Sequence, residues 1–202
     1  GKPSGQLDQL ASAVGGVIFA DFADPAAPQV EKIHADGLLP PGMTLCVTDT
    51  RGSHSELTGE FAAIRQEMEA VAACLGGKVL GQVPETDFWA ALPRLRTACG
   101  DRAVLRAFHI YADNDRVAKQ VAALREGDFG TFLRLVSESG HSSWEYLQNV
   151  IPAGYKEHQE MGVTIAAAKH YLQGKGAVRV HGGGFAGTAQ AFVPVDMLAD
   201  FK

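Results

Sequence analysis

The densest glycine run of this sequence lies between Ala177 and Pro194 and reads AVRVHGGGFAGTAQAFVP. Gly182, Gly184 and Gly187 fit the spacing G-x-G-x-x-G that follows a strand in dinucleotide-binding proteins. That function also requires a helix after the glycines, with its N-terminus at the pyrophosphate. Here the following residues, TAQAFVP, alternate in polarity and end in proline, which predicts a strand. We therefore expect a hairpin tip, which either brings bare backbone close to a ligand or is only a tight turn.

A second candidate for chemistry is Asp8, in the sequence GKPSGQLDQ. Leu7, Leu10 and Val14 have helical spacing, so Asp8 falls in the first turn of a predicted helix. The helix dipole favours an ionised carboxylate at that end, which suits a general base. The alternative is that Asp8 or Ser4 is an ordinary N-terminal cap.

Histidine and cysteine show no recognisable site. The seven histidines include no H-E-x-x-H motif and no pair four residues apart, and HSSWE and KEHQE are typical of a polar surface. Cys46, Cys74 and Cys99 form no C-x-x-C. We expect reduced thiols packed as small apolar side chains, as in a cytoplasmic protein, and we predict no metal site.

The elements that must position these residues are strands at both ends of the chain with helices between them. Runs rich in β-formers predict strands over residues 17–22, 28–34, 43–50, 176–180 and 188–194. Apolar spacing predicts helices over residues 55–75, 101–124, 128–147 and 155–172. The third helix is expected to be capped by Asp128 and to break at Gly140. This order predicts an α+β fold, with a small antiparallel sheet and helices packed on one face.

Composition agrees with a globular protein. The 202 residues are 46% hydrophobic and 20% charged, enough for a core without disulfides or metals. A net charge of −5 argues against nucleic-acid binding, and no apolar run approaches the ~18 residues of a membrane helix. The first residue is glycine, and a helix is only beginning in the final PVDMLADFK. We expect a piece of a longer protein.

Four motifs, in order, resemble those of the GHMP sugar and metabolite kinases, and among these the galactokinases. GKPSGQLDQ is similar to P-C-G-I-M-D-Q, and TDTRGSHSELTGEFAAIRQ resembles N-S-N followed by V-R-H-S-L and E-Y-x-x-R-R. NDRV and SGHSSWEYL resemble E-N-x-R-V and S-H-x-S-L, and RVHGGGFAG resembles R-M-T-G-G-G-F-G-G. The resemblance covers nearly the whole chain.

The resemblance implies the C-terminal part of a cytoplasmic kinase that transfers the γ-phosphate of ATP, with Mg²⁺, to the anomeric hydroxyl of galactose or a related sugar. It implies a remnant of the N-terminal kinase domain in residues 1–40. Residues 41–202 would form the ferredoxin-like C-terminal domain of these kinases. No membrane or nucleic-acid partner is implied.

The same resemblance assigns site residues. Asp8 takes the place of the aspartate that accepts the proton of the sugar hydroxyl, and Gly5 lies against the sugar. Gly183 and Gly184 fall on the loop that closes the sugar site, and Phe61 falls on a sugar-contacting tyrosine. Because phenylalanine has no hydroxyl, one hydrogen bond to the sugar is lost.

A further departure is Ser53, which stands where the family motif V-R-H-S has arginine. The family's first sugar-binding motif and its G-L-S-S-S-A loop, which holds ATP and Mg²⁺, are absent from this sequence. We therefore expect the missing N-terminal half to be the partner of this piece, and the piece alone to be inactive. Two alternatives remain: a GHMP kinase for another sugar or small alcohol, and a non-catalytic sugar-sensing homologue.

Overall fold

The structure is a computed structural model, and it describes residues 6–24, 26–33, 39–40, 42–52 and 57–201. Gly5, Ser4 and Ser53 lie outside these residues. The described part begins with α1 (Leu7–Val14) and a two-stranded antiparallel sheet, β1 (Val17–Asp21) and β2 (Gln29–Ile33). These strands lie within the first two predicted from the sequence, residues 17–22 and 28–34.

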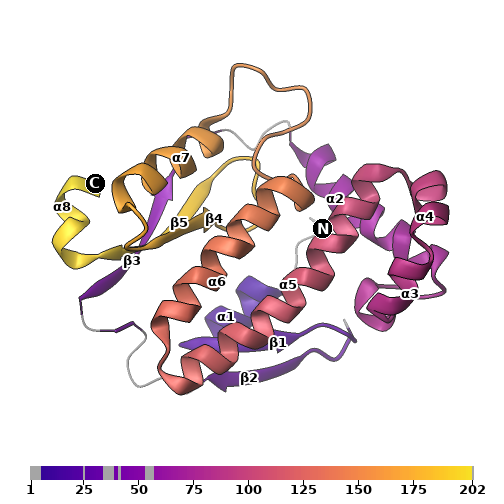
Figure 1. The fold of residues 1–202 in the computed structure, drawn as a ribbon, viewed down its shortest axis with the longest axis horizontal. Coiled ribbons are helices and arrows are strands. Elements are labelled where there is room, and N and C mark those ends of the chain that lie inside the picture. The colour runs from indigo at the N-terminus through magenta and orange to yellow at the C-terminus, as the bar shows by residue number, and fades with distance from the viewer. Residues whose placement is uncertain (1–5, 25, 34–38, 41, 53–56, 202) are drawn as a thin grey trace.

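A second antiparallel sheet holds the glycine run. Its strands are β3 (Met43–Asp49), β4 (Ala177–Val180) and β5 (Thr188–Pro194), in the order β3-β5-β4 (Figure 1). The last strand in the sequence therefore lies between an early strand and its own hairpin partner. The glycine run joins β4 to β5, so the predicted hairpin is confirmed and no helix follows the glycines.

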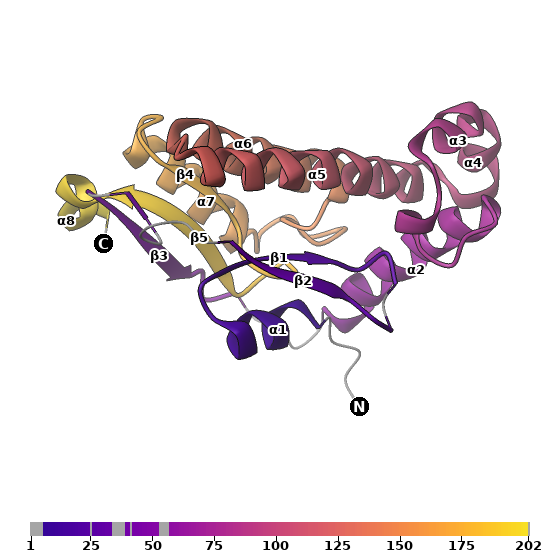
Figure 2. The same ribbon diagram turned by 90° about the horizontal axis from the view of Figure 1, so that it is seen from below.

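Helices fill the chain between the sheets. They are α2 (Thr58–Cys74), the short 3₁₀ turn η1 (Leu80–Gln82), α3 (Glu85–Ala90), α4 (Leu92–Cys99), α5 (Asp101–Glu126), α6 (Phe129–Ser142), the π-turn η2 (Ser143–Leu147) and α7 (Glu160–Leu172). After β5 come η3 (Val195–Met197) and α8 (Leu198–Phe201). Figure 2 shows α5 and α6 side by side above the β1–β2 hairpin, with α1 on the hairpin's other side and α3 and α4 at one end of the molecule.

The core divides at the three-stranded sheet. On one face Val178, Val180 and Ala191 pack against α7, and on the other Ala177 and Phe192 pack against α6. Side chains alternate along a strand, so these two sets must point in opposite directions. The α+β class is confirmed; α7 packs on one face, and α6 packs on β4 and Phe192 of the other, where Leu45 and Val47 of β3 are exposed.

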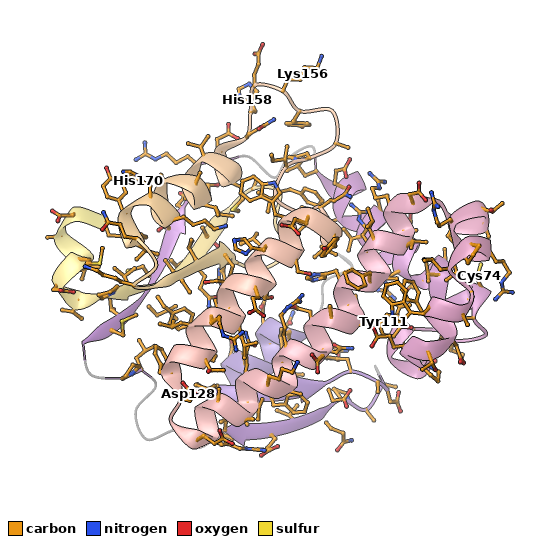
Figure 3. All side chains as sticks on the ribbon, in the orientation of Figure 1. Cys74, Tyr111, Asp128, Lys156, His158 and His170 are labelled. Carbon is orange, nitrogen blue, oxygen red and sulfur yellow. The ribbon has the colours of Figure 1, made fainter. Side chains whose placement is uncertain are left out.

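Two helix boundaries differ from those predicted. α6 continues through Gly140 because that residue lies against β4, where an added Cβ would be 3.0 Å from Arg179 Cβ. The glycine permits close helix–strand packing and does not end the helix. The predicted cap is confirmed, since Asp128 accepts a hydrogen bond from the Thr131 amide at 3.0 Å; it is labelled at the turn between α5 and α6 in Figure 3.

The other difference concerns α7, which begins at Glu160 rather than near Tyr155. The residues before it form an exposed loop, from which Lys156 and His158 point away from the body of the molecule (Figure 3). The sequence KEHQE therefore lies on the surface, as predicted.

Candidate functional site

The tip of the β4–β5 hairpin, which we call the glycine loop, comprises residues 181–187. The His181 amide donates to the Thr188 carbonyl at 3.0 Å, and the amide and hydroxyl of Thr50 both donate to the Gly187 carbonyl at 2.8 Å. The loop is thus hydrogen-bonded at its base, where β4 meets β5. It is also hydrogen-bonded to Thr50, the residue directly after β3. Gly182, Gly184 and Phe185 have positive φ angles of 72°, 91° and 61°. These angles account for part of the glycine content, since left-handed backbone is costly for most other residues.

The three adjacent glycines of the loop have different surroundings. An added Cβ at Gly183 would lie 2.7 Å from the Phe61 ring, and one at Gly184 would lie 2.1 Å from the carbonyl oxygen of Asn149. A Cβ at Gly182 would meet no atom within 4 Å. Gly183 and Gly184 therefore allow the protein's own atoms to approach, while Gly182 has open space where a side chain would be.

Asn149 is the residue that holds the loop from beneath. Its side chain is 2% exposed, its Nδ2 donates to the Gly183 carbonyl at 3.2 Å, and its own carbonyl accepts from the Phe185 amide at 2.5 Å. Its Oδ1 is buried and accepts no hydrogen bond from the described residues. Two backbone groups of the loop are thus satisfied by a single buried residue.

Phe61 contacts the loop from α2. Its ring meets the Phe185 ring edge to face at a centroid distance of 5.4 Å, and with Leu57, Ile64 and Ala186 the two rings form a small apolar cluster. The structure therefore brings together three of the residues predicted for the site, namely Phe61, Gly183 and Gly184.

Below Asn149, the π-turn η2 is held by buried cations. The Arg106 side chain is 1% exposed; its Nε donates to the Leu147 carbonyl at 3.0 Å and its Nη1 contacts Glu67 at 2.8 Å. Arg179 on β4 donates to the hydroxyls of Ser139 at 2.7 Å and Ser143 at 3.4 Å. Burial lowers the pKa of both guanidinium groups.

A buried histidine completes this polar layer. His109 Nδ1 lies 2.9 Å from the Ser142 hydroxyl, and burial lowers its pKa from 6.5 to about 4, although Asp113 opposes the shift. The imidazole is therefore neutral at physiological pH. The expectation that all of HSSWE lies on the surface is wrong, because Ser142 and Ser143 are buried partners of this layer.

Asp8 lies in the first turn of α1, as predicted, and is exposed. The cap of α1 is Gln6, so Asp8 is not the N-cap. Within the described residues its side chain forms no hydrogen bond or ion pair, and none joins it to the glycine loop. Its predicted role, and that of Gly5, stay predictions.

The described residues contain no group of three or more His, Cys, Asp or Glu side chains that could hold a metal ion, and no helix among them is long and apolar enough to cross a membrane. The three cysteines are free and partly buried. Cys74 and Cys99 lie side by side with their sulfurs 3.4 Å apart, and burial raises the pKa of Cys99 to about 11. The thiols are less buried than the sequence suggested.

Sequence reasoning did not find Asn149, Thr50 or Arg106. Each acts across the fold, on partners at least 34 residues away in the chain. No local pattern marks them, and only the π-turn that precedes Asn149 is a structural feature that often accompanies functional sites.

Comparison with known proteins identifies relatives of this chain. No family model matches the chain. Over 198 residues it is 35% identical to the galactokinase of Streptomyces coelicolor, covering 96% of this chain and 47% of that protein. It is 27% identical to the galactokinase of Mannheimia succiniciproducens (100% and 49%) and 31% identical to that of Thermotoga petrophila (93% and 48%).

A solved structure has the same fold. The crystal structure of Lactococcus lactis galactokinase complexed with galactose matches with a TM-score of 0.63 at 20% identity, over 87% of this chain and 42% of that one. The chain spans about half the length of the curated relatives it matches. These matches confirm the resemblance predicted from the motifs: the chain is a relative of the galactokinases that corresponds to about half of each.

Proposed function

We propose that this chain is the C-terminal part of a cytoplasmic galactokinase-like sugar 1-kinase. The similarity to galactokinases over 96% of the chain carries this proposal. The packing of the glycine loop on Phe61 supports it, because the loop and the position of the sugar-contacting aromatic residue lie together as the family resemblance requires. We further propose that residues 1–40 belong to the N-terminal kinase domain and residues 41–202 to the C-terminal domain.

In the proposed reaction, the Asp8 carboxylate accepts the proton of the anomeric hydroxyl while that oxygen attacks the γ-phosphorus of ATP. The bond from this phosphorus to the β,γ-bridging oxygen breaks, and ADP leaves. Phosphoryl transfer depends mainly on positioning and charge, so one well-placed carboxylate is the chemical group this chain would supply. The loop residues Gly183 and Gly184, with Gly5 and Phe61, would line the sugar.

ATP would be bound chiefly by the other half of the protein. Mg²⁺ would likewise be bound chiefly by the other half, and no step assigned to this chain passes through the metal. We expect this chain on its own to bind ATP weakly and not to turn over.

The test is Asp8→Asn in the full-length protein. Turnover with galactose should fall by about 10²–10⁴-fold, while the dissociation constant for the sugar changes little. Asp200→Asn is the matched control, because Asp200 is also an exposed carboxylate in the first turn of a helix. Unchanged turnover in Asp8→Asn would remove this residue from the mechanism.

Because Phe61 stands where the family has a sugar-contacting tyrosine, related sugars should be compared as substrates. A panel of galactose, arabinose and amino sugars, assayed on the full-length protein and on Phe61→Tyr, measures which hydroxyl pattern the site accepts. We expect Phe61→Tyr to improve kcat/KM for galactose, because it restores a hydroxyl that can bind the sugar. No turnover of any of these sugars, with sugar binding retained, would favour the sugar-sensing alternative.

A further inference from the structure

The position of the glycine loop depends on Asn149. Its amide nitrogen binds the Gly183 carbonyl, its backbone carbonyl binds the Phe185 amide, and Gly184 packs directly on it. These three contacts involve consecutive residues of the loop tip. Displacement of Asn149 would therefore move the whole tip.

Asn149 is itself fixed by rigid elements. The amides of Gln148 and Asn149 both donate to the Ser143 carbonyl, at 2.8 and 3.4 Å, and Gln148 has a left-handed φ of 57°. The turn that precedes them is held by Arg106 from α5 and Arg179 from β4. Asn149 thus links the loop to the α5–α6 layer.

Stability alone does not account for an asparagine here. Its Oδ1 is buried without a partner among the described residues, and an unpaired buried acceptor destabilises the fold. An apolar side chain of similar size, such as leucine, would avoid that cost but would leave the Gly183 carbonyl without its donor. Violations of this kind are expected where a side chain serves a function.

We propose that Asn149 is a positioning residue for the sugar site. By its hydrogen bond to the Gly183 carbonyl it fixes the position of the loop backbone relative to the substrate. This rests on the proposed function for the identity of the substrate. The positioning itself, however, is a property of the fold that can be measured without turnover. Gly182, with open space where a side chain would be, adjoins the loop backbone proposed to line the sugar.

The first test is hydrogen–deuterium exchange of the peptide covering residues 181–188 in the full-length protein. Asn149→Leu removes the donor to the Gly183 carbonyl and the unpaired Oδ1 together; the lost hydrogen bond and the relieved buried acceptor oppose each other, so thermal stability should change little. Loop exchange should become about tenfold faster, while α5 and α6 stay protected. Asn114→Leu is the matched control, since Asn114 is an exposed asparagine on α5.

The second test is steady-state kinetics of the same variants. The KM for sugar should rise about tenfold with kcat reduced less than threefold and the KM for ATP unchanged, because the loop would bind ground state and transition state alike. A residue that only supported folding would instead lower the active fraction, and with it kcat, at constant KM.

Loop exchange within twofold of the wild type would overturn the proposal, and so would a loss of protection throughout the chain, since Asn149 would then be merely structural. If wild-type protein phosphorylates no sugar, the proposed function fails, while faster loop exchange in Asn149→Leu would still support the positioning role. The two failures are therefore distinguishable.

Discussion

The glycine loop and α1, which hold the two halves of the predicted site, differ sharply in how the chain supports them. The loop lies on a 2%-exposed asparagine and continues into β4 and β5, whose residues are mostly buried. α1 has no buried residue, Leu7 is 51% exposed, and among the residues of strands β1 and β2 only Ile33 is buried.

The difference indicates which part of the site this chain organises by itself. The loop is fixed through the π-turn to the α5–α6 layer, where buried cations and polar groups are paired. Asp8 lies on an amphipathic helix in which Leu7 and Val14 are exposed and Leu10 is only partly buried, which suits an element that packs against a further part of the protein. Four predictions test this difference.

The largest expected effect is at Glu67, which pairs with the buried Arg106 and with Arg102. Glu67→Leu leaves Arg106 buried without its carboxylate, and the free energy of unfolding should fall by about 3–5 kcal/mol. The matched control is Glu69→Leu, whose partner Arg65 is 72% exposed and whose loss should cost less than about 1 kcal/mol. Chemical denaturation of both variants measures the difference. Equal losses would mean that the buried Glu67–Arg106 ion pair matters no more to the fold than an exposed one.

The second effect is a dependence of stability on pH. Because the pKa of His109 is lowered from 6.5 to about 4, the unfolded chain binds its proton more readily than the folded one. The stabilisation from a neutral His109 is fully present above pH 6.5. It is lost as the pH falls toward 4, and the total loss in the free energy of unfolding is about 3 kcal/mol. Denaturation curves of His109→Gln should lack this part of the slope, whereas His141→Gln, at an exposed histidine on α6, should keep it. The same slope in both variants would contradict a buried neutral His109.

The third effect separates two glycines of the loop. Gly184→Ala would place a methyl group 2.1 Å from the Asn149 carbonyl oxygen, while Gly182→Ala meets no atom within 4 Å, although both have positive φ. Both should lose stability from the left-handed backbone, and Gly184→Ala should lose about 1–3 kcal/mol more. Thermal denaturation provides the comparison, and equal losses would show that Asn149 does not support the tip.

The smallest expected effect is in α1. Leu7→Ala should change the free energy of unfolding of this chain by less than about 0.5 kcal/mol, because the side chain is already half exposed. Leu172→Ala, at a 1%-exposed leucine of α7, should cost about 2–5 kcal/mol. If Leu7→Ala destabilised this chain as strongly as Leu172→Ala, α1 would be part of its core and the contrast with the loop would be lost.

The features predicted well from the sequence were those that depend on local patterns. The spacing of apolar residues gave α5, Asp128 was found as a cap, and the strand after the glycines excluded a dinucleotide site. Gly140 was wrongly predicted to break the helix. The reason for a glycine at this position is contact with β4, which lies 39 residues further along the chain. Asn149 was missed because its role comes from a left-handed residue after a π-turn and from a partner in a distant hairpin, neither of which leaves a periodic signal.

The central claim is that the full-length protein phosphorylates galactose or a related sugar with ATP. The most direct measurement is ³¹P NMR of that protein incubated with ATP and galactose. We expect sugar-dependent formation of ADP together with an equal amount of a phosphate ester at the anomeric carbon. Absence of any sugar-dependent ADP, with galactose and with the related sugars of the panel, would contradict it.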